Sequence, residues 1–186
     1  PLWSRGLGDV YKRQIFICLV VSMIIPFQAV MIPLTSIFGG LGLLPTKASL
    51  IYIYIGSGAP LAVFLYHGFI VTGIPNALEE AALLDGCNQF QTFTRIVFPL
   101  LKNVTSTVFI IDTLWIWNDY LLPSLVLISP ENRTLPLSTY AFYGSHSIDY
   151  GPLMASLILC VVPVILVFLA FQKNIINGVV AGAVKS

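Results

Sequence analysis

The chain has 186 residues, of which 57% are hydrophobic and only 9% are charged. A soluble domain is about a quarter charged, so the composition excludes a water-exposed globule and indicates that the lipid bilayer is the solvent. The formal net charge of +1 gives no strong field for nucleic acid, and nucleic-acid binding is not expected.

Residues 1–14 (PLWSRGLGDVYKRQ) are polar and contain glycine, unlike the apolar sequence that follows. The segment resembles translated adapter sequence of the kind fused to fragments in assembled sequence data, and we expect it to be foreign to the protein. The alternative is an ordinary cytoplasmic loop. On either interpretation we expect the chain, which begins at Pro1 rather than at Met, to lack the true N-terminal part of the protein.

Four later stretches are apolar enough to cross a membrane as helices, which takes about 20 residues each. They are residues 15–33, 48–70, 104–122 and 152–171, with boundaries placed approximately. The third stretch contains Asp112 and Asp119 and is the weakest on hydropathy. Prolines inside the stretches are tolerated in membrane helices when neighbours satisfy the freed carbonyls. The sequence therefore predicts an all-α polytopic membrane bundle over residues 15–186.

Basic residues gather on one side of the predicted spans, at Arg95, Lys102, Lys173 and Lys185. The loops on the opposite side hold only Lys47 and Arg133. Because cytoplasmic loops carry the excess of lysine and arginine, we expect the loop 76–103 and the C-terminus to be cytoplasmic, in a cell inner membrane. The polar and aromatic loop 129–150 then lies outside.

The start of the cytoplasmic loop predicts a short helix over about residues 76–86. Asn76 is expected to cap its N-terminus, with Glu79 three residues later completing a pattern like a capping box. Gly86 fits the left-handed position that ends a helix.

The surface of this helix is small and acidic. The side chains of Ala81 and Ala82 are small, so another protein can approach the helix closely. Glu80 provides a carboxylate that could bind an arginine of that protein. The alternative is an interfacial helix lying flat on the membrane, but such helices usually have a basic polar face. The residues alone leave both interpretations open.

The same loop carries a spaced motif. Glu80-Ala81-Ala82, three residues, Gly86, nine residues, Ile96, one residue and Phe98-Pro99 resemble the EAA motif of permease subunits of ATP-binding-cassette importers. Phe98 stands where that motif has leucine, which is a mild apolar change.

Further likeness covers the chain from about residue 15 to its end. The segment WIWNDYLLP at 115–123 is similar to a WxWNDFLxP segment of carbohydrate-type permeases. Residues 26–43, 134–136 and 181–185 resemble elements of the same subunits, of the maltose permease type. Such subunits have about six spans, so the chain resembles their last four.

The resemblance implies that the helix at 76–86 is the coupling helix, which sits in a groove on separate ATPase subunits. Glu80 pairs with an arginine there, Ala81 and Ala82 pack in the groove, Gly86 supplies the turn and Asp85 adds a polar contact. The implied coupling residues are Glu79, Glu80, Ala81, Ala82, Asp85, Gly86, Ile96 and Pro99. The implied partners are the ATPase subunits, a second and non-identical permease, and an extracytoplasmic sugar-binding protein.

Polar residues in the third span are candidates for a translocation path: Asp112, Trp115, Asn118 and Asp119. A mid-span carboxylate is costly, so Asp112 either lines a cavity or is bonded to Thr107, Thr113 or a neighbouring helix. The tryptophans either stack on sugar rings or form an interfacial belt or core packing. Asn118 and Asp119 are expected to cap or bridge helices where the span bends.

No catalytic, metal or cofactor site is expected. Cys18, Cys87 and Cys160 are far apart and have no CxxC or histidine at ligand spacing. There is no GxxxxGK[ST] phosphate loop, so ATP hydrolysis is expected on a partner subunit. The alternatives to an importer permease are an ion-coupled secondary transporter or channel, for which Asp112 alone is thin support, and a membrane scaffold, which needs no EAA spacing.

Overall fold

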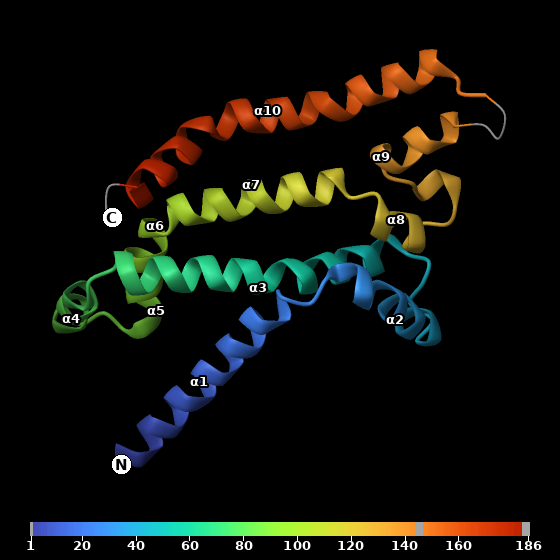
Figure 1. The fold of residues 1–186 in the computed structure, drawn as a ribbon. Helices are drawn as coiled ribbons and strands as arrows, with labels where there is room; N and C mark the ends of the chain where they lie inside the picture. The colour runs from blue at the N-terminus through green and yellow to red at the C-terminus, as the bar shows by residue number, and fades with distance from the viewer. Residues whose placement is uncertain (1, 144–146, 184–186) are drawn as a thin grey trace. The chain divides into compact units, whose positions relative to one another are not determined.

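Helices make up every regular element in the part of the chain that the structure describes (Figure 1). The computed structural model describes residues 2–143 and 147–183. The long helices are α1 (Leu2–Ser22), α2 (Phe27–Gly40), α3 (Lys47–Gly73), α7 (Lys102–Asn118) and α10 (Tyr150–Ala183). The short ones are α4 (Asn76–Leu84), α5 (Gln89–Thr92), the π-helix η1 (Phe93–Val97), α6 (Phe98–Leu100), α8 (Leu121–Val126), η2 (Pro130–Asn132), α9 (Leu135–Ser138) and η3 (Thr139–Phe142). The predicted all-α class is confirmed.

Two helices are long and apolar enough to cross a membrane, α3 and the Tyr150–Gln172 stretch of α10. They correspond to the second and fourth predicted spans, and each tolerates an internal proline, Pro60 or Pro163. Two bent pairs pass the same test when each is taken as one span: Val10–Ser22 with Phe27–Gly40, and Gln89–Leu100 with Lys102–Asn118. The described residues therefore hold between two and four spans.

The first predicted span is not one continuous helix. α1 ends at Ser22, α2 begins at Phe27 with Pro26 as its N-cap, and the pair is bent by 104°. Proline has no N–H to donate and disfavours the α conformation in the residue before it, so Pro26 ends the helix instead of being carried inside it. The prediction that residues 15–33 run straight through Pro26 is wrong.

The described chain divides into two compact units. One unit gathers residues 60–110 with the described parts of residues 1–23 and 171–186. Its core consists of Ile74, Val97, Leu101, Val104 and Val108, packed against side chains of α3. Tyr66 of α3 donates a hydrogen bond to the Thr105 hydroxyl of α7 at 2.8 Å, so a half-buried polar pair is satisfied beside this apolar contact.

The other unit gathers residues 24–59 and 111–170. Its core joins α3, α8 and α9 through Leu50, Ile53, Tyr54, Leu122, Val126, Leu127 and Leu137. Phe27, Leu34 and Phe38 of α2 pack against this core. The polar loop 129–150 thus contains short helices anchored by Leu137, and is not an irregular connector.

The predicted helix at 76–86 is present as α4, but its N-terminal cap differs from the prediction. The N-cap is Pro75, one residue before the predicted Asn76, and it makes no side-chain cap hydrogen bond, so the predicted cap at Asn76 is wrong. Pro75 has the extended conformation (ψ 136°) that Asn76 would have needed as the cap. The capping box in this loop belongs instead to α5, where Asn88 and Gln91 bond each other's backbone N–H groups.

The C-terminal end of α4 follows the prediction. Gly86 has φ +81°, its N–H donates to the Leu83 carbonyl, and the Cys87 N–H donates to the Ala82 carbonyl. This Schellman motif satisfies carbonyls that the helix would otherwise leave unpaired. The side chains of the predicted tail element 181–185 lie outside the described residues.

Replacing Gly86 with alanine should loosen the last turn of α4. Alanine at this backbone conformation costs about 1 kcal/mol, although a Cβ there meets nothing within 4 Å. We expect the Gly86 and Cys87 amides of the full-length subunit to exchange hydrogen roughly fivefold faster, as read by mass spectrometry of the peptide that contains them. The matched control is Gly68→Ala, where space is also open and the helical φ suits alanine. Equal local exchange in the two variants would contradict the left-handed cap.

Candidate functional site

The helix α4 presents an acidic and apolar surface that the chain itself does not cover. Glu79, Glu80, Ala81 and Asp85 are exposed, and within the described residues neither glutamate has an ion pair or a hydrogen bond. Leu84, in the last turn, is 89% exposed. Figure 1 shows α4 beyond the end of α3, where the chain turns back toward α5. The surface of α4 therefore combines acidic and apolar side chains that no described residue covers.

Ala82 differs from its neighbour in the motif, because it is only 2% exposed. Its side chain is therefore buried by this chain, and within the described fold it holds α4 in place. Of the two alanines, only Ala81 is on the exposed side of α4, where its small side chain would let another protein approach the helix closely. The sequence-based expectation that both alanines meet a partner's groove is thus refined: the structure gives them different surroundings.

The second half of the motif joins the loop to the span α7. Ile96 is half-buried within the π-helix η1, and Pro99 stands in α6. Pro99 has no N–H for the Arg95 carbonyl, and the Phe98 N–H reaches back five residues to the Phe93 carbonyl, as a π turn requires. Val97, next to Ile96, is buried in the same core as Leu101 and Val104. The second half of the motif therefore lies in η1 and α6, next to the buried core of this unit.

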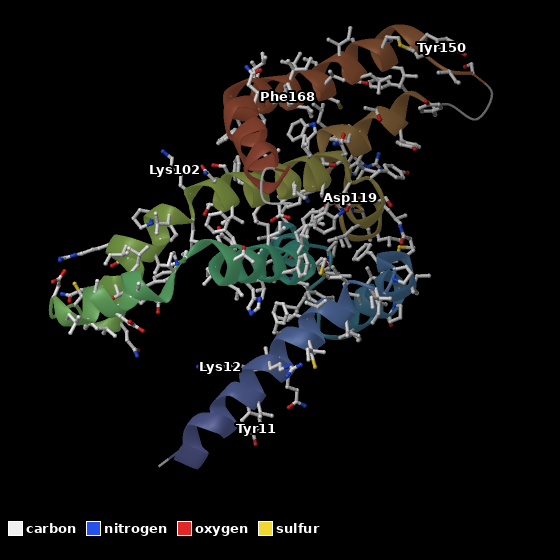
Figure 2. All side chains as sticks on the ribbon, turned by 60° about the vertical axis from the view of Figure 1, so that its left-hand side comes forward. Tyr11, Lys12, Lys102, Asp119, Tyr150 and Phe168 are labelled. Atoms are coloured by element: carbon white, nitrogen blue, oxygen red, sulfur yellow. The ribbon has the colours of Figure 1, made fainter. Side chains whose placement is uncertain are left out.

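The segment 115–123 forms the junction between α7 and α8. Asp119 lies at the end of α7 (Figure 2), where its Oδ1 accepts a hydrogen bond from the Leu121 N–H at 2.9 Å and its Oδ2 accepts one from the Tyr54 hydroxyl at 2.8 Å. The Asn118 amide donates to the Leu114 carbonyl at 2.7 Å. The expectation that these residues cap or bridge helices is confirmed for Asp119, which does both, whereas the Asn118 side chain bonds only within α7.

The tryptophans of this segment pack against neighbouring helices. The Trp117 indole N–H donates to the Cys160 carbonyl of α10 at 2.9 Å. The bond pairs the indole donor with a backbone acceptor of another helix. Trp115 makes an edge contact with Tyr54, with ring centroids 5.7 Å apart. Packing, the alternative favoured by this geometry, accounts for both rings.

Asp112 lies against a glycine of α3. A Cβ built on Gly58 would be 3.6 Å from Asp112 Oδ1, so the carboxylate occupies the space that glycine leaves open. Thr107, one of the expected partners, donates its hydroxyl to the Asn103 carbonyl instead. No hydrogen bond from a described residue reaches the Asp112 carboxylate. Of the two acids in the third predicted span, one is thus fully bonded and the other is not.

Tyr54 and Gly58, the residues of α3 that contact the two acids, were not among the site residues predicted from the sequence. A signal for Gly58 was present, because the small residues of GSGAP at 56–60 mark close helix approach in membrane proteins. Tyr54 gave no signal of its own, since aromatic residues are common in spans.

Among the described residues there is no group of three or more His, Cys, Asp or Glu side chains that could hold a metal ion.

The bond between Tyr54 and Asp119 should contribute measurably to stability. We expect Tyr54→Phe and Asp119→Asn each to lower the free energy of unfolding of the full-length subunit in detergent. A double-mutant cycle should give a coupling energy of about 1 kcal/mol, the usual scale for a hydrogen bond between membrane helices.

Tyr52→Phe is the matched control, because Tyr52 is also on α3 and is exposed. It should leave the free energy of unfolding unchanged. Additive effects of Tyr54→Phe and Asp119→Asn, with no coupling, would show that the junction does not depend on their bond.

Residues 2–180 match the family described as "Binding-protein-dependent transport system inner membrane component". Several proteins are similar over most of the chain. The probable starch degradation products transport system permease protein AmyC of Thermoanaerobacterium thermosulfurigenes is 43% identical over 171 residues, which is 92% of this chain and 62% of the relative.

The multiple sugar-binding transport system permease protein MsmG of Streptococcus mutans is 42% identical, over 90% of this chain and 60% of the relative. The melibiose/raffinose/stachyose import permease protein MelC of Bacillus subtilis is 38% identical, over 94% and 63%. The chain thus spans about three fifths of the length of these relatives.

Proposed function

The chain belongs to the family of binding-protein-dependent transport system inner membrane components, and we propose that it is part of a permease subunit of an ATP-binding-cassette importer for a sugar or oligosaccharide. The subunit is not itself an enzyme: it provides the path, and separate ATPase subunits hydrolyse ATP. The further partners are a second, non-identical permease and an extracytoplasmic binding protein. The loop 76–103 and the C-terminus face the cytoplasm.

The observation that carries this proposal is the exposed surface of α4. It combines the spacing of the EAA motif with carboxylates that have no partner among the described residues and with the exposed Leu84. An arginine of the ATPase pairs with Glu80, and apolar side chains of the ATPase cover Leu84. Charge-assisted bonds between arginine and carboxylate are directional, so they fix the docked orientation. Glu79, Ala81 and Asp85 complete this surface.

Coupling follows from how the loop is joined to the membrane span. α5, η1 and α6 lead directly into α7, and Val97 and Leu101 share one core with residues of α3. Packed cores shift as units because they are not continuously deformable. When the ATPase subunits close, the displaced α4–α5 segment moves α7 through η1. Ile96 and Pro99 act in this step by fixing the π turn, and Gly86 acts by holding the end of α4.

The cargo is a neutral sugar because relatives from three organisms are described as permeases for starch degradation products, multiple sugars, and melibiose, raffinose and stachyose. A sugar presents hydroxyl groups that bond to carboxylate, amide and indole groups along a path. Asp112, whose carboxylate is free among the described residues, is the group of α7 we assign to this path. Trp115 and Asn118 border it in sequence, whereas Asp119 supports the junction.

Reversing the charge of Glu80 should uncouple transport. We expect Glu80→Lys in the complete, reconstituted transporter to reduce ATP-driven sugar uptake at least tenfold, because a lysine repels the arginine that Glu80 pairs with. Co-purification of the ATPase should fall with it. Glu131→Lys, at an exposed acid of the outer loop, is the control and should transport normally. Normal uptake and ATPase recovery with Glu80→Lys would show that α4 docks nothing through this residue.

Neutralising Asp112 should separate a path role from a packing role. Asp112→Asn keeps the shape of the side chain but removes a charge that costs free energy in an apolar environment, so stability should be unchanged or higher. Uptake should fall about tenfold, because bonds from sugar hydroxyls to a charged acceptor are lost. The readouts are the thermal midpoint and sugar uptake, with Asp149→Asn as the exposed control. Lower stability with normal uptake would assign Asp112 to packing.

A further inference from the structure

Three tyrosine rings contact one another in series in the unit that contains α8 and α9. The rings of Tyr120 and Tyr140 are stacked, with centroids 4.0 Å apart and an interplanar angle of 25°. Tyr143 contacts Tyr140 with its ring tilted by 33°, and the two ring centroids are 5.5 Å apart. We name Tyr120, Tyr140 and Tyr143 the tyrosine ladder.

The ladder leads from the core to the surface. Tyr120 packs against the core of Leu122 and Val126, whereas Tyr140 and Tyr143 are 52% and 51% exposed. Within the described residues the hydroxyl groups of all three rings are without a hydrogen-bond partner. Tyr120 covers one face of Tyr140, so the outer part of the ladder offers the remaining exposed ring surface of Tyr140 and Tyr143 together with neutral hydroxyls.

The backbone on both sides of the ladder is held in place. Tyr120 is the N-cap of α8 and directly follows Asp119, both of whose carboxylate oxygens are bonded. Tyr140 lies in η3, which follows α9 and its buried Leu137. Tyr143 pairs with Ile148 in an antiparallel bridge. Rings fixed in this way lose little conformational entropy when they bind a ligand.

We propose that the tyrosine ladder is a stacking site for a pyranose ring of the transported carbohydrate. The inference rests on the proposed function, and adds a binding site on the outer loop to it. A pyranose has a face of C–H bonds, which an aromatic ring covers, and a rim of hydroxyls, which phenol hydroxyls can bond as donors or acceptors. The groups of the ladder are neutral, so they suit an uncharged polyhydroxylated ligand better than an ion.

The test uses the full-length subunit in its complex with the second permease and the ATPase, in lipid nanodiscs and without the binding protein. Maltotriose and raffinose serve as probes, and saturation-transfer NMR reports protein contact with their ring C–H protons. We expect signal with the wild type and its loss with Tyr140→Ala and Tyr143→Ala. Tyr140→Phe and Tyr143→Phe keep the rings and should retain most of the signal.

Uptake by the complete transporter provides a second measurement. We expect the two alanine variants to raise the KM for the transported probe roughly three- to tenfold at an unchanged maximal rate, the range expected for one lost aromatic contact. Tyr150→Ala is the matched control, since Tyr150 is 63% exposed and makes no ring contact with a described residue. Tyr143→Ala leaves the stack of Tyr120 on Tyr140 intact, so it tests the ladder even where Tyr140→Ala fails to fold.

Each other outcome overturns the inference in a distinct way. Wild-type NMR signal and KM in both alanine variants would remove the ladder from sugar binding while leaving the proposed function intact. Weaker binding of the sugar-free binding protein, with unchanged sugar contacts, would make the ladder a protein-docking surface. A wild-type transporter that carries no carbohydrate would overturn the proposed cargo and the stacking site together.

Discussion

The fold depends on one constraint: in an apolar solvent each backbone N–H and C=O must find its partner within the protein. A continuous helix meets this constraint by itself, so the described chain is helical wherever it runs uninterrupted. Every break in a helix must then be satisfied by specific groups. Gly86 does so at the end of α4 through a Schellman motif, and Asp119 does so at the start of α8 by accepting from the Leu121 N–H.

The two acids in the third predicted span show how this constraint separates structure from function. Asp119 uses both carboxylate oxygens to hold a helix junction to Tyr54 of α3. Asp112, two turns earlier, faces the open space at Gly58 and is bonded by no described residue. A carboxylate in apolar surroundings is costly, and the cost at Asp119 is offset by its bonds. At Asp112 the offset has to come from a ligand or a partner, which is why we assign Asp112 to the path.

The proposed coupling surface of α4 likewise separates residues that hold the structure from residues that are exposed. Buried residues of the loop, such as Ala82 and Val97, hold its two halves in the fold. The exposed residues Glu80 and Leu84 are left for an external surface. The π-helix η1 sits between them and the span α7. A motif that is continuous in the sequence therefore contains exposed residues, which we propose to dock, residues that pack and residues that shape the backbone.

The sequence by itself determined the solvent, the helical class, the positions of the α3 and α10 spans, the helix α4 and its glycine cap, because composition, hydrophobic length and local backbone preferences decide these. It misplaced the cap at Asn76 and the continuity through Pro26, where neighbouring prolines override local patterns. Only the tertiary structure decided that Tyr54 bonds Asp119, that Gly58 makes room for Asp112 and that three tyrosine rings contact one another. Such contacts join residues far apart in the chain, and no local periodicity encodes them.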